Sequence, residues 1–91
     1  MRQTKYADEI ATASVLLGDT HEGRLERLLI KGTRKVEIRF SWWKAGRMLT
    51  RPLDLPEESL LELLASAIQK DVLSPTFITR LREITAECPA P

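Results

Sequence analysis

Cysteine and histidine are almost absent from this 91-residue chain, which contains one of each, Cys88 and His21. A metal site, or a nucleophile activated by an imidazole, needs several such side chains close together, so the composition argues against both kinds of site. A lone cysteine cannot form an internal disulfide. Because no apolar export signal is visible either, we expect a cytoplasmic protein.

Glycine is also scarce, and its arrangement excludes a further class of site. The four glycines are dispersed, so there is no glycine-rich loop to cradle a phosphate group. No apolar run approaches the roughly 18 residues of a membrane-spanning helix, and we expect no membrane partner. These absences predict no cofactor, no metal, no catalytic residues and no enzymatic activity. A small basic ribonuclease toxin is the one enzymatic alternative, but the single tyrosine, Tyr6, is remote in sequence from the basic residues.

Positive charge is concentrated in the middle of the chain. The net charge is only +1, yet residues 24–53 contain nine basic and two acidic residues. The flanking segments are acidic. A basic segment between acidic flanks is consistent with binding to a polyanion such as nucleic acid. The alternative is that these charges pair with acidic neighbours across the fold or form a solvated face.

The N-terminal third gives two ambiguous segments. Residues 5–17 combine helical spacing of apolar side chains with strand-favouring residues, and both readings stay open. Residues 24–31 have a helical leucine stripe, but we predict a strand there. The reason is that an isolated two-stranded hairpin is marginal in water, so the strong hairpin downstream needs a neighbouring strand.

The clearest element is a β-hairpin formed by residues 34–43 and 47–53. Apolar and polar residues alternate strictly through 34–43, which is typical of a half-buried antiparallel strand. We predict a three-residue turn at Lys44-Ala45-Gly46, which would place Trp43 opposite Arg47. A two-residue turn would exchange the faces of the return strand.

Two helices are predicted after the hairpin, over about 55–71 and 75–87. Asp54 is expected to cap the first helix and Ser74 the second, where Pro75 suits the first helical position. The apolar stripe of the first helix should cover one face of the hairpin. The residues of that face are Val36, Ile38, Phe40 and Trp42. The sequence therefore predicts an α+β fold, with an antiparallel sheet of three to four strands followed by two C-terminal helices packed on one face. Residues 1–88 form one domain in this interpretation, and 89–91 form a disordered tail.

The opposite face of the predicted hairpin is the candidate binding site. It combines cations, which suit phosphates, with an indole ring on which a base can stack. The candidate residues are Lys35, Arg39, Trp43, Lys44, Arg47 and Arg51. We expect a non-enzymatic accessory or regulatory protein that binds single-stranded or duplex nucleic acid through this face. The alternative is a protein-interaction module whose same face binds an acidic partner or forms a homodimer interface.

Two resemblances accompany this interpretation. The segment IRFSWWKAGRMLTRPLDLPEESLLELL, within residues 37–74, resembles a recurring segment of small uncharacterised bacterial and mobile-element proteins, which implies no activity. In the order of its elements the chain is similar to the PC4-like single-strand-binding domains. That similarity is one of outline, and the second C-terminal helix departs from it.

Overall fold

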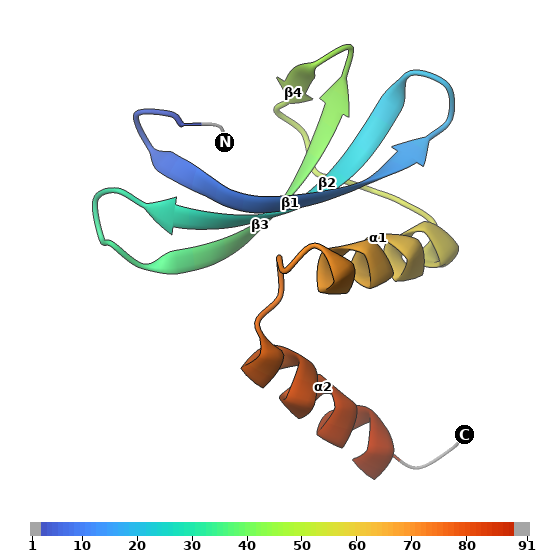
Figure 1. The fold of residues 1–91 in the computed structure, drawn as a ribbon. Helices are drawn as coiled ribbons and strands as arrows, with labels where there is room; N and C mark the ends of the chain where they lie inside the picture. Colours follow the sequence, from blue (N-terminus) through green and yellow to red (C-terminus); the bar gives the residue numbers. More distant parts are fainter. Residues whose placement is uncertain (1–2, 89–91) are drawn as a thin grey trace.

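The computed structural model describes residues 3–88 of the chain as a four-stranded antiparallel sheet followed by two helices (Figure 1). In chain order the elements are β1 (Ala7–Leu17), β2 (His21–Ile30), β3 (Val36–Lys44), β4 (Arg47–Leu49), α1 (Glu57–Gln69) and α2 (Pro75–Glu87). The strands pair in sequence order, β1-β2-β3-β4. The predicted α+β arrangement is confirmed, whereas the predicted disordered tail, 89–91, lies outside the described residues. Neither helix is long and apolar enough to cross a membrane.

The two ambiguous N-terminal segments are both strands. β1 pairs with β2 along its whole length, from Ala7 opposite Ile30 to Leu17 opposite His21, with a bulge at Ile10. The strand prediction for 24–31 is confirmed, and β2 then pairs with β3 on its other edge. The spacing of apolar residues in 5–17 is also compatible with a helix. Pairing with β2 along the whole strand overrides that local preference.

The turn between β3 and β4 has two residues, so the predicted three-residue turn is wrong. Ala45 and Gly46 both have positive φ, 51° and 77°. Two consecutive positive φ values are characteristic of the type I′ turn, whose twist matches that of the flanking strands. Lys44 therefore lies opposite Arg47, and β4 ends at Leu49 instead of continuing to residue 53.

The shorter turn exchanges the faces of the return strand. Trp43 is opposite Met48, and Trp42 is opposite Leu49. The predicted pairing of Trp43 with Arg47 is therefore wrong. Because side chains alternate between the two faces of a sheet, Arg47 lies on the side of Trp42 and Lys44, away from Trp43.

The main core lies between α1 and the β1–β2 half of the sheet. Its buried members are Ala13, Leu25, Leu63, Ala67, Val72 and Leu73. Leu25 is opposite Phe40 in the β2–β3 register, so α1 covers the face of the sheet that the sequence predicted. The helix is nevertheless shifted toward β1, where the small side chains of Ala11 and Ala13 allow close approach.

This shift leaves the predicted core face of β3 largely uncovered. Val36, Ile38 and Phe40 are 45%, 40% and 51% exposed. Their prediction as buried scaffold is wrong, because α1 packs on β1 and β2 and does not extend over these three side chains. The alternation in β3 correctly indicated a strand, but it did not indicate which neighbour would cover it.

The helix starts agree only in part with the predicted caps. The N-cap of α1 is Pro56 and no side chain caps it, so the prediction for Asp54 is wrong. Glu57 and Glu58 occupy the first turn, where acidic side chains interact favourably with the helix dipole. The prediction for Ser74 is confirmed, since its Oγ accepts a hydrogen bond from the backbone N–H of Phe77 at 3.2 Å.

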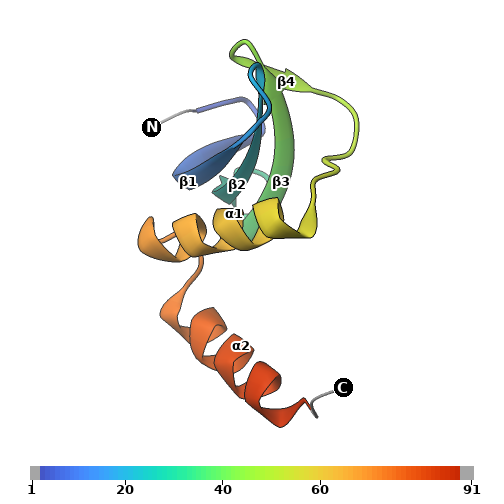
Figure 2. The ribbon, with the colours of Figure 1, turned by 90° about the vertical axis from the view of Figure 1, so that its right-hand side faces the viewer.

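The last helix, α2, does not pack on the sheet. Figures 1 and 2 show it beneath α1, directed away from the strands. Ile78 is partly buried against the main core, but α2 contains no fully buried residue. The expectation that both helices pack on one face therefore holds only for α1.

The turn geometry predicts that an alanine is tolerated at Gly32 but not at Gly46. Gly46→Ala places a Cβ at a φ of 77°, which we expect to lower the free energy of unfolding by about 1–2 kcal/mol. Gly32 lies in the β2–β3 turn without a positive φ, and an added Cβ there meets nothing within 4 Å. Gly32→Ala is the matched control, expected to be neutral or stabilising by up to about 1 kcal/mol. Urea denaturation measures both, and equal effects would contradict the type I′ turn.

Candidate functional site

The six predicted binding residues do not form one cluster. Arg39 and Trp43 lie on the sheet face opposite α1, whereas Lys44 and Arg47 lie on the α1 face of the hairpin. Lys35 precedes β3 at the far end of the strand, about 30 Å from Lys44 at the usual rise per residue. The predicted site is therefore divided between two faces of the hairpin.

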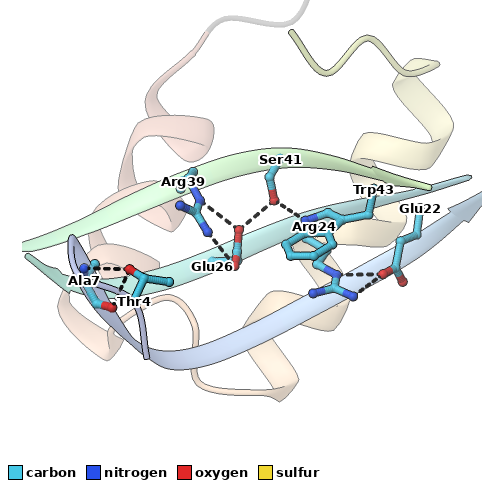
Figure 3. A network of polar contacts seen from close by, with 8 residues as sticks. All are labelled: Thr4, Ala7, Glu22, Arg24, Glu26, Arg39, Ser41 and Trp43. Carbon is cyan, nitrogen blue, oxygen red and sulfur yellow. Dashed lines mark hydrogen bonds and ion pairs between the residues drawn. The ribbon is translucent and has the colours of Figure 1, made fainter. Parts of the chain in front are cut away.

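A buried ion pair occupies the face opposite α1. The side chain of Glu26, on β2, is fully buried directly across from Arg39 on β3. Arg39 donates through Nε and Nη2 to the two carboxylate oxygens of Glu26, each at 3.0 Å. Ser41 donates its hydroxyl to Glu26 Oε1 at 2.6 Å (Figure 3). Arg39 is therefore committed to an internal contact.

Trp43 belongs to the same internal network. Its indole N–H donates to Ser41 Oγ at 2.8 Å, and the guanidinium of Arg24 lies 3.8 Å above the centre of its ring (Figure 3). Arg24 is itself paired with Glu22. Trp43 is only 6% exposed, so it is a core residue and not the exposed ligand contact that the sequence predicted. The physical reason is that Ser41 satisfies its polar atom while Arg24 covers its ring.

The network sets the protonation of Glu26. Burial by itself raises the pKa of this carboxyl. Hydrogen bonds from Arg39 and Ser41, together with the charge of Arg39, outweigh burial and hold the pKa of Glu26 below its usual value. Glu26 is therefore ionised at neutral pH and contributes to stability as an anion.

A second, more open cluster lies at the other face of the hairpin end. Arg51 places its guanidinium 4.4 Å above the centre of the Trp42 ring, and His21 packs against the same ring with centroids 5.5 Å apart. Trp42 was predicted as core but is only half-buried, as is His21. Lys44 and Arg47 lie beside them at the turn and are exposed. We call these five residues the Trp42 cluster.

Among residues 3–88, the cations of the Trp42 cluster lack the ion-pair partners that the arginines of the opposite face have. Within residues 3–88, Lys44, Arg47 and Arg51 form no ion pair, whereas Arg24 and Arg39 each pair with a glutamate. Lys35, also without an ion pair among residues 3–88, precedes β3 at the far end, whereas within β3 and β4 the cations without an ion pair, Lys44 and Arg47, lie at the turn end and on one face. This end is the part of the described chain best suited to an anionic ligand.

The sequence interpretation overlooked the partners that remove Arg39 from the surface. Glu26 looked like one of two acidic residues diluting a basic segment. One signal was available: Glu26 stands between Leu25 and Leu28 in an expected strand, where a charged side chain calls for a partner of opposite sign. The partner could be identified only from the β2–β3 register.

Comparison with known proteins supplies no further assignment. No family model matches the chain, and no curated protein or solved structure matches it significantly. The two resemblances noted in the sequence therefore remain predictions. Among the residues that the structure describes, no three His, Cys, Asp or Glu side chains are grouped to hold a metal ion.

The buried ion pair predicts a pH-dependent stability. Because the folded-state pKa of Glu26 is lowered, its stabilising effect is present above the unfolded-state pKa and is lost as pH falls through the folded-state pKa. Glu26→Gln leaves the partly exposed Arg39 without its charged partner, and we expect it to lower the free energy of unfolding at neutral pH by about 1–3 kcal/mol. The variant should also lose less stability on acidification than the wild type.

Urea denaturation at neutral and acidic pH measures both effects. Glu37→Gln is the matched control, because Glu37 is an exposed glutamate on β3, and its effect should stay within about 0.5 kcal/mol. If the free energy of unfolding of Glu26→Gln falls on acidification as much as that of the wild type, Glu26 does not account for the acid-induced loss of stability.

Proposed function

We propose that the protein binds nucleic acid through the Trp42 cluster at the end of the β3–β4 hairpin. The observation that carries this proposal is that three cations without ion pairs among residues 3–88 lie at this end of the hairpin, one of them, Arg51, directly over the Trp42 ring. This site retains Lys44, Arg47 and Arg51 from the sequence prediction. It replaces Trp43 with Trp42 as the aromatic element and leaves Arg39 and Lys35 outside.

The chemistry of the cluster suits a phosphate backbone with unpaired bases. The guanidinium groups of Arg47 and Arg51 can each bind two phosphate oxygens, and Lys44 adds a point charge. A nucleobase can take the place of the Arg51 guanidinium on the Trp42 ring, which releases Arg51 to a phosphate. Stacking of this kind needs a base outside a duplex, so we propose a single-stranded ligand in preference to a duplex.

An acidic protein is the competing partner for the same positive charge. Such a partner would use the cations but would have little use for the Trp42 ring as a stacking surface. The close approach of Arg51 to that ring shows that a flat, electron-poor group fits there. This geometry favours a nucleic acid over an acidic peptide.

Binding of a fluorescent single-stranded oligonucleotide tests the proposal. Arg47→Ala combined with Arg51→Ala removes two phosphate contacts and should reduce the slope of log affinity against log salt by about 1.4. Trp42→Leu keeps an apolar side chain but removes the stacking surface, and should weaken binding by about 1–3 kcal/mol at all salt concentrations. Fluorescence anisotropy over a salt series measures both quantities.

The matched control is Arg82→Ala, which removes one exposed positive charge from α2. Its affinity and salt slope should equal those of the wild type. Circular dichroism confirms that each variant is folded. The proposal fails if the wild type does not bind the oligonucleotide at low salt, or if Arg82→Ala weakens binding as much as the loss of Arg47 and Arg51.

A further inference from the structure

The chain leaves apolar surface uncovered on β3. Val36, Ile38 and Phe40 project from the face of the sheet that α1 covers elsewhere, and all three are 40–51% exposed. A sheet face of this kind normally packs against another element. None of the described residues fills this role, because α1 lies on β1 and β2.

Both helices also have exposed apolar stripes. On α1, Leu61 and Ile68 share one flank at helical spacing and are 65% and 40% exposed. An open hollow of about 330 Å³ lies along this flank of α1. Its lining residues are Glu57, Glu58, Leu60, Leu61 and Leu64.

On α2 the stripe consists of Phe77, Leu81 and Ile84. Phe77 is 48% and Ile84 is 47% exposed. An isolated helix of this length is marginal in water and needs tertiary packing to persist. Among the residues that the structure describes, α2 therefore has an apolar face without a surface beneath it, and β3 has an apolar face without a helix above it.

The segment before α2 is held in the main core. Val72 and Leu73 are buried in the main core. The backbone carbonyl of Val72 accepts a hydrogen bond from Arg27 Nη1 at 3.1 Å. The backbone N–H of Val72 donates to the carbonyl of Ala67 at 3.0 Å. These contacts fix the point where α2 begins and direct it away from β3 (Figure 2). Within residues 3–88, α2 therefore does not occupy the β3 face, which stays open to a second molecule.

The dimensions of the stripes suit one another. Phe77 to Ile84 spans about 10 Å along a helix, and Val36 to Phe40 spans about 13 Å along a strand. Together, the seven most exposed apolar side chains of β3, α1 and α2 present roughly 600 Å² per copy, most of the roughly 800 Å² per partner in a standard stable interface. Each copy offers both halves of the contact, which is the requirement for a closed two-fold dimer.

We infer that the protein forms a homodimer in which α2 of each copy lies on the β3 face of the other, beside the exposed flank of α1. The interface uses Phe77, Leu81 and Ile84 from one copy and Val36, Ile38 and Phe40 from its partner. The Trp42 cluster lies beyond the end of this stripe, so dimerisation and nucleic-acid binding use different residues.

The mass of the full chain in solution is the first test. Size-exclusion chromatography with light scattering should give twice the monomer mass of 10.4 kDa for the wild type. Ile84→Asp on α2 and Phe40→Asp on β3 should each halve that mass while circular dichroism stays folded. Thr79→Asp is the matched control, because Thr79 is exposed on the opposite side of α2, and it should remain a dimer. A monomeric wild type, or a Thr79→Asp variant as monomeric as Ile84→Asp, would overturn the inference.

Cross-linking tests the exchange of α2 itself. Two chains are prepared in a Cys88→Ser background, one with Ile84→Cys and the other with Phe40→Cys, and mixed with a short bismaleimide. We expect a cross-linked product that contains one chain of each kind. Thr79→Cys replaces Ile84→Cys in the control mixture and should give little of this product. Equal yields from both mixtures, or no mixed product, would overturn the placement of α2 on the partner's β3.

Discussion

The buried carboxylate of Glu26 aligns β2 with β3. Removing a charge from water is costly unless other groups replace its hydrogen bonds, and here Arg39 and Ser41 do so from the neighbouring strand. A slip of β3 by two residues would keep every side chain on its own face and so would satisfy the hydrophobic alternation. The slip would, however, separate Arg39 from Glu26 and leave the carboxylate unpaired. The register is therefore selected by the polar network, in addition to the apolar pattern.

Alignment of these two strands determines which residues reach solvent. Arg39 and Trp43, which look like surface residues in the sequence, complete the network on one face. Because Arg39 and Trp43 are engaged in internal contacts, the accessible basic and aromatic group is the one on the other face. It consists of Trp42, Arg51 and the two basic residues at the turn. The need to pair Glu26 on one face of β3 thus determines which side chains form the candidate binding surface on the other face.

The sequence predicted the order and type of the last four elements, because alternation, turn residues and a serine cap are local signals. Residues 5–17 were resolved only by pairing, since β1 gains its partner from β2. The candidate site was predicted less well for a simple reason. One residue in the length of a turn decides the face of every residue in the return strand, and Lys44-Ala45-Gly46 permits both lengths. The uncovered state of Ile38 and Phe40 also could not be predicted, because it depends on where α1 settles on the sheet.

The short β4 strand leaves most of β3 without a neighbour on its outer edge. β4 pairs only with Trp42, Trp43 and Lys44, so the backbone groups from Val36 to Ser41 on that edge have no ladder partner among residues 3–88. An open edge beside an apolar face is a template for strand addition, which natural sheets usually block with charges or cover with another element. At high concentration, any chain whose β3 is left uncovered is therefore prone to edge-to-edge aggregation. Glu37 is the one exposed charged side chain between Val36 and Ser41, because Arg39 is held by Glu26.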